Sequence, residues 1–148
     1  MYIDFINTFK SIADEINPDG TFYHGRVSDA NLAIDKLPLP QIHVYPFKVA
    51  PINKTYGLDN APNILLAFIF QDSPNSNDTE RDAIINEADT MQRAFRSKLD
   101  ELDLDYTNYE AEPFFKQFSG VTSGMFVRFN MTLKVTACWL LTTYWSDG

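Results

Sequence analysis

Apolar positions recur along this chain at two different periods, and each period predicts a different kind of element. From Tyr2 to Ile16 they follow one another at steps of three and four, the spacing that places side chains on one face of an α-helix. The same spacing runs from about Thr79 to Leu102 and predicts a second, longer helix, which a Thr79–Asp82 pair is expected to cap. The apolar positions of this long helix are Ile84, Ala88, Met91, Phe95, Leu99 and Leu102.

Strand-like patterns occupy the region between these two helices. Thr21 to Arg26 and Gln41 to Phe47 predict short strands, and Pro46 is expected at a strand end or a sheet edge because it cannot donate a ladder hydrogen bond. The intervening residues, which end at Leu37–Pro40, predict a less regular stretch. Asn63 to Gln71 is apolar throughout, which is typical of a strand covered on both faces, so we expect it at the centre of the sheet.

The last part of the chain predicts a long β-hairpin. Two strand-like runs, Tyr106 to Phe118 and Thr122 to Val135, meet at a Gly-rich turn. From Met125 to Val135 the second run alternates strictly, so that one face is apolar and the other carries Phe126, Arg128, Asn130, Thr132 and Lys134. The order of elements predicts an α+β fold. We expect one mainly antiparallel sheet, a long helix and an N-terminal helix packed on one of its faces, and a long C-terminal β-hairpin.

Length and composition predict a single domain over residues 1–148, with an aromatic C-terminal tail at about 138–148. Hydrophobic residues make up 45% of the chain, which argues against disorder over most of its length. No apolar run reaches the roughly 18 residues that cross a membrane. The first residues carry Asp4 and no basic lead, so no signal peptide is expected. The expected setting is the cytosol or a particle assembled there.

The net charge of −8 argues against an ordinary nucleic-acid-binding surface, because phosphates would be repelled. An acidic balance is also what keeps many proteins soluble.

Candidate chemistry is sparse, and we predict no catalytic, cofactor-binding or metal-binding residues. His24 and His43 each stand in a predicted strand without a ligand spacing around them. Cys138 is the single cysteine and lies in a hydrophobic run, where a thiol is expected to be buried and inert. The acidic run Asp100 to Asp105 is expected to be a solvated helix end followed by a strand start.

Aromatic residues give a better-supported hypothesis, that of a subunit interface. Alternation places Phe114 and Phe118 on one face of the hairpin and Phe115 on the other, so each face holds a large ring. Two interpretations stay open: the C-terminal tail or another helix covers the second face, or another copy of the protein does. The candidate interface residues are Phe115, Phe126, Arg128, Lys134, Trp139, Tyr144 and Trp145.

The order of elements resembles that of the tail terminator, or tail-completion, family of long-tailed phages. The resemblance covers the chain from the N-terminal helix to Val135 and is one of architecture, without an invariant motif. It is carried by four segments: LPLPQIHVYPF, NILLAFIFQD, DTERDAIINEADTMQRAFRSKLDEL and FFKQFSGVTSGMFVRFNMTLKV.

This resemblance implies a structural virion protein rather than an enzyme. Such a protein forms a homo-oligomeric ring, a hexamer in this family, that terminates the tail tube and takes part in head–tail joining. Its partners would be the tail tube protein and the head–tail connector proteins, with DNA only as passing cargo, no membrane and no cofactor. Its location would be the virion tail, assembled in the host cytoplasm. The alternative is an acidic monomeric or dimeric binding module that acts as a decoy or inhibitor of a basic partner.

Overall fold

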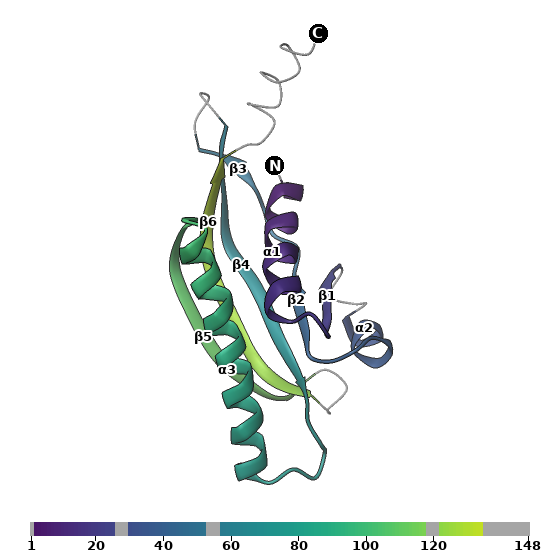
Figure 1. Cartoon of the computed structure of the whole chain (residues 1–148). Coiled ribbons are helices and arrows are strands. Elements are labelled where there is room, and N and C mark those ends of the chain that lie inside the picture. Colours follow the sequence, from purple (N-terminus) through teal and green to yellow (C-terminus); the bar gives the residue numbers. More distant parts are fainter. Residues whose placement is uncertain (1, 26–29, 53–56, 118–121, 135–148) are drawn as a thin grey trace.

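The computed structural model describes residues 2–25, 30–52, 57–117 and 122–134, which form an elongated α+β domain (Figure 1). In this part of the chain the helices are α1 (Tyr2–Ile16), α2 (Ala30–Lys36) and α3 (Asp78–Glu101). The strands are β1 (Thr21–His24), β2 (Gln41–Val44), β3 (Ala50–Pro51), β4 (Leu58–Gln71), β5 (Asp105–Gln117) and β6 (Thr122–Lys134). The predicted N-terminal helix, long helix and C-terminal hairpin are confirmed.

The strands form one sheet in the order β1-β2-β4-β6-β5, with the short β3 paired to the start of β4. Only the β1–β2 pair is parallel; the other neighbours are antiparallel, as predicted. The apolar strand β4 lies in the middle, between β2 and β6, which confirms its predicted central place (Figure 1). Pro46 follows the end of β2, where its missing N–H costs no ladder bond.

Strand β4 begins earlier than its apolar run. Asp59 and Asn60, which precede the strand predicted from Asn63 to Gln71, pair with β3 on one side and β6 on the other. Pro62, which cannot donate a ladder hydrogen bond, is accommodated because the pairing register shifts between Ala61 and Ile64, so that Pro62 lies in a β-bulge. Asn63 completes the bulge at φ 54°, and its N–H donates to Asn130 Oδ1 at 2.9 Å.

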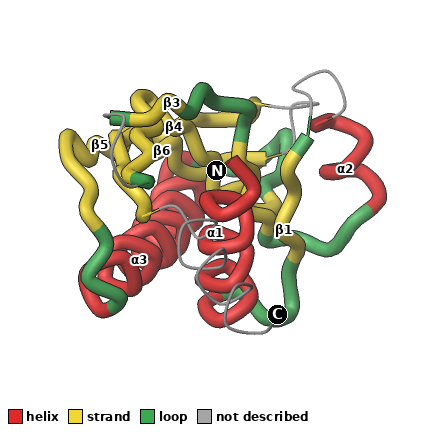
Figure 2. The backbone as a smooth tube through the Cα atoms, turned by 90° about the horizontal axis from the view of Figure 1, so that it is seen from above, coloured by secondary structure: helices red, strands yellow, loops and turns green. Residues whose placement is uncertain are grey.

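The main core lies between the sheet and the helices α1 and α3. Figure 2 shows both helices on the same side of the sheet. Phe5 and Phe9 of α1 and Phe95 of α3 pack there against Phe68 of β4 and Phe129 of β6, all fully buried. The apolar stripe of α3 is confirmed as far as Leu99. Leu102, predicted as its last member, lies beyond the helix and is exposed, because the chain turns toward β5 there.

Helix α2 was not predicted, since the stretch between β1 and β2 was expected to be irregular. It has only seven residues, too few for a clear period, and two prolines follow it closely. It packs on the face of the sheet opposite to α1 and α3, which we call the outer face. There its Ile34 packs with Tyr45, Ala67 and Ile69 in a second, smaller core, and Figure 2 shows α2 next to β1, apart from α1 and α3.

The start of α3 is capped by residues other than the predicted pair. Asn77 is the N-cap: its side chain accepts from the Glu80 N–H at 2.9 Å, while Glu80 Oε1 accepts from the Asn77 N–H at 3.2 Å. This is a reciprocal capping box, and the predicted Thr79–Asp82 cap is wrong.

Replacing Asn77 with alanine is therefore expected to lower the free energy of unfolding by about 1 kcal/mol, because it leaves helix N–H groups without their acceptor. Thr79→Ala, at an exposed position two residues along, is the control and should change stability by a few tenths of a kcal/mol at most. Urea unfolding of both variants measures the difference. Equal losses would show that the capping box does not hold the helix start.

The hairpin combines one regular strand with one that is bulged twice. Strand β6 alternates without interruption, whereas β5 shifts register between Thr107 and Glu110 and again between Phe114 and Gln117. Each shift holds a residue at positive φ, Asn108 at 56° and Lys116 at 51°. These bulges decide which β5 side chains reach the outer face.

Candidate interaction surface on the outer sheet face

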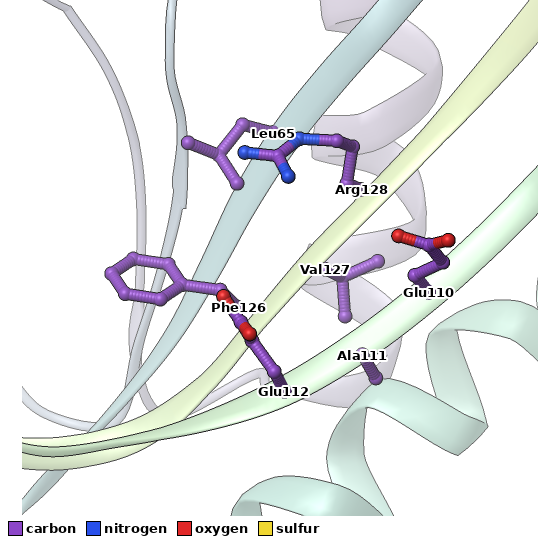
Figure 3. A pocket seen from close by; sticks show the side chains of 7 residues that line it. All are labelled: Leu65, Glu110, Ala111, Glu112, Phe126, Val127 and Arg128. Carbon is purple, nitrogen blue, oxygen red and sulfur yellow. The ribbon is translucent and has the colours of Figure 1, made fainter.

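A groove of about 450 Å³ lies on the outer face of the sheet, across β4, β6 and β5 (Figure 3). The register lines up its parts: Leu65 of β4 is level with Arg128 of β6, which is level with Glu110 of β5. Two residues further along each strand, on the same face, Phe126 pairs with Glu112. The groove is lined by Leu65, Glu110, Ala111, Glu112, Phe126, Val127 and Arg128.

The apolar part of this groove consists of Leu65 and Phe126, both only half-buried. Phe126 is held in place by Phe114, whose ring centroid lies 4.6 Å away. Phe114 in turn lies over Gly124, its cross-strand partner, where a Cβ would stand 1.8 Å from the Phe68 carbonyl oxygen. Because no side chain fits at Gly124, the Phe114 ring covers that part of β6 and supports Phe126 from one side.

The charged part consists of one exposed guanidinium and two exposed carboxylates. Within the described part of the chain, no carboxylate lies within ion-pair distance of Arg128, although Glu110 is its cross-strand neighbour. Figure 3 shows the Arg128 guanidinium extending toward Leu65, while Glu110 stays on the β5 side. An opposite-charge pair at this spacing would contribute about 0.2–1 kcal/mol if it closed. Arg128 thus keeps its donors available to a group from outside these residues.

The predicted interface residues do not all share this face. Phe126, Arg128 and Lys134 follow the uninterrupted alternation of β6 and lie on the same side, with Lys134 at the end of the strand. Phe115 lies on the opposite side, toward α3, where the Arg81 guanidinium lies 5.5 Å from its ring centroid and 45% of the residue is exposed. It is therefore not part of the groove. Trp139, Tyr144 and Trp145 lie outside the described residues.

Five of the lining residues were not among the predicted interface residues: Leu65, Glu110, Ala111, Glu112 and Val127. Val127 belongs to the core face, as predicted, and Ala111 is its cross-strand partner. Leu65 belongs to a run that is apolar at every position, so its face could not be assigned without the pairing. For the two glutamates, the bulge at Asn108 changes the alternation of β5, so counting from Tyr106 places them on the wrong side.

Elsewhere, the polar side chains form structural networks. A second groove of about 350 Å³, between α3 and β5, holds Arg96 stacked 4.9 Å over Tyr109 and hydrogen-bonded through Nε to Tyr106 Oη at 3.1 Å. Tyr109 Oη donates to Gln92, and burial raises its pKa above the usual range. These contacts tie the edge strand β5 to α3.

Both histidines are in strands, as expected, and both are hydrogen-bonded within the fold. His24 lies against Tyr2 Oη and the Val44 carbonyl, each at 3.0 Å. His43 is fully buried on the outer face beside α2, where burial lowers its pKa to about 4.

The described residues form neither a metal-binding cluster nor a membrane-spanning helix. No group of three or more His, Cys, Asp or Glu side chains there is arranged to hold a metal ion. None of the described helices has the length and apolar character needed to cross a membrane.

Comparison with known proteins gave no relative: no protein-family model matches the chain, and no curated protein matches its sequence.

Proposed function

We propose that this protein is a structural subunit of a phage or phage-like tail. It assembles through the outer face of its sheet into a ring that terminates the tail tube and joins it to the head. The observation that carries the proposal is the groove on this face, which leaves Leu65 and Phe126 half-exposed beside an Arg128 that meets no carboxylate among the described residues. The architectural resemblance to tail terminators supplies the context.

The composition of this face suits a protein–protein contact. Interface cores are enriched in aromatic residues and Arg, with charged groups toward the rim. Here Phe126 and Leu65 form an apolar centre, and Arg128, Glu110 and Glu112 surround it. A neighbouring subunit would remove the two apolar side chains from water and give the charges partners.

The charge balance supports contacts between copies of the chain. With a net charge of −8, most of the surface of a neighbouring copy is acidic, and Arg128 and Lys134 place two cations on the outer face. The ring would be a hexamer, as the resemblance implies, with the tail tube and head–tail connector proteins as partners. DNA would pass through without being gripped, because an acidic lumen repels phosphates.

Charge reversal tests the proposal directly. The double variant Arg128→Glu and Lys134→Glu should lower the oligomer mass to that of a monomer, because it sets like charges against each other across the interface. Circular dichroism should show an unchanged fold, since both side chains are exposed. Native mass spectrometry or light scattering reads the mass.

A matched control carries Lys10→Glu and Arg93→Glu on the helices of the other side, where both side chains are more than half exposed. It changes the net charge equally and should assemble like the unmodified chain. If the outer-face variant also assembles normally, the face is only solvated. A clean monomer of the unmodified chain at high concentration would eliminate the ring and favour the acidic binding module, whose binding to basic proteins should weaken with salt.

A further inference from the structure

We propose that the groove on the outer face is the docking site for the aromatic C-terminal tail, residues 138–148, of a second copy of this chain. This inference rests on the proposed ring, since it names the segment that links one subunit to the next. It is carried by the match between the groove and the tail, and by the distance between the groove and the point where the tail leaves its own sheet.

The groove has the size and chemistry to receive large apolar side chains. Its volume of about 450 Å³ lies over Leu65 and Phe126, and Phe114 fixes the Phe126 ring from the side. Buried aromatic anchors in such pockets contribute most of the binding energy in many interfaces. An incoming indole or phenol ring would cover the apolar centre and leave the flanking charges at the edge.

The tail has the matching sequence. Its apolar residues recur at steps of three and four, the spacing of an amphipathic helix that docks by one face. These positions are Leu140, Leu141, Tyr144 and Trp145, and Ala137, directly before the tail, continues the pattern. The one charged residue from Val135 to Gly148 is Asp147, two positions after Trp145. Its carboxylate has the sign required by Arg128.

The length of the tail, compared with its distance from the groove, favours the tail of another copy over the chain's own tail. The described part of β6 ends at Lys134, eight residues along the strand from Phe126, which is roughly 26 Å. A helix from Ala137 to Trp145 would be only about 13 Å long. Folded back from Lys134 along its own strand, it would stop short of the groove. A neighbouring subunit, placed with the end of its β6 beside the groove, has no such limit.

Tryptophan fluorescence offers a direct measurement, because both tryptophans of the chain, Trp139 and Trp145, belong to the tail. We expect blue-shifted emission at concentrations where the ring forms and a red shift on dilution, in step with the fall in mass. Phe126→Glu should raise the dissociation constant roughly 30-fold or more and shift the emission to the red at a given concentration. The control Ile3→Glu changes an exposed apolar residue on α1 and should leave the dissociation constant and the emission wavelength unchanged.

Cysteine crosslinking identifies the contact. Glu112→Cys places a thiol at the groove. The sequence pattern alone predicts a buried, inert Cys138, but a tail that docks on a neighbour carries Cys138 out of its own subunit's core, so that it supplies the second thiol. A short thiol-specific crosslinker should then give a ladder of two, three and more linked chains, because each subunit is joined to the next. The unmodified chain, with one cysteine, can give dimers at most. The control Asp82→Cys, exposed on α3 away from the outer face, should give no ladder above dimers.

Two outcomes would overturn the inference. A 112–138 link within a single chain, with blue-shifted emission that does not depend on concentration, would mean that the tail folds onto its own sheet. No linking above the Asp82→Cys control would mean that the tail docks elsewhere. If either occurs while the mass remains that of a ring, only the tail's role is wrong. If the unmodified chain is a monomer throughout, the proposed function fails as well.

Discussion

Replacing Phe95 with alanine is expected to lower the free energy of unfolding by about 3–5 kcal/mol, the cost of removing a buried phenylalanine ring and leaving a cavity. Phe95 is fully buried where α3 meets both α1 and the sheet. Its ring centroid lies 6.0 Å from that of Phe9 in α1, 5.7 Å from Phe68 in β4 and 6.4 Å from Phe129 in β6. One truncation therefore loosens three elements at once.

The chain offers a matched control in Phe115→Ala, which removes the same side chain from a position that is 45% exposed. Its loss should be only about 1–1.5 kcal/mol, because little more than half of the residue is buried and its removal leaves no enclosed cavity. Urea unfolding, with both variants in the same oligomeric state, gives the two values. Similar losses at the two sites would mean that Phe95 does not hold the layers together. Domains are stable by only about 5–15 kcal/mol, so the Phe95 variant should unfold at a visibly lower urea concentration.

The elements that the sequence predicts well are those whose pattern is long and whose packing is simple. The N-terminal helix and α3 each present one apolar stripe to the sheet over several turns, and β4 is apolar because both its faces are covered. Helix α2 could not be predicted because contacts with a different element stabilise it. The Gln41 side chain of β2 donates to the Ala33 and Leu37 carbonyls, at 2.9 and 3.1 Å. Hydrogen bonds of this kind leave no hydrophobic pattern in the sequence of the helix itself.

The candidate surface was predictable only in part, for a related reason. The regular strand β6 shows its two faces directly, so Phe126 and Arg128 could be chosen from the sequence. Their neighbours depend on the register of the adjacent strands, and the bulge at Asn108 shifts the alternation of β5. A bulge has no reliable signal when its positive φ is adopted by Asn or Lys instead of Gly. Only the pairing of the strands therefore assigns three further residues to the groove: Leu65, Glu110 and Glu112.

We expect His43 to make the stability of the fold depend on pH. The imidazole is fully buried on the outer face, with the ring of Tyr23 from β1 at 4.8 Å. Its Nε2 lies 2.6 Å from Gln41 Oε1, and the Gln41 amide already donates to α2, so Nε2–H must be the donor. The neutral Nε2–H tautomer can make this bond, and burial lowers the pKa of His43 from 6.5 to about 4, which favours the neutral ring in the fold.

The sign of the pH effect follows from this shift. Between pH 6.5 and about 4 the unfolded chain binds a proton at His43 that the folded chain does not, so stability falls as the pH is lowered through this window. The slope is about 1.4 kcal/mol per pH unit, and the total loss by pH 4 is on the order of 3 kcal/mol.

We expect His43→Gln, which does not titrate and keeps an N–H donor, to remove this part of the pH dependence of stability. Carboxylates titrate in both proteins, so the difference between their urea-unfolding curves at pH 7, 6, 5 and 4 isolates His43. Parallel curves would mean that the imidazole is protonated in the fold at little cost. A gap that changes by about 1.4 kcal/mol per pH unit would instead establish that the folded chain holds His43 neutral in this window.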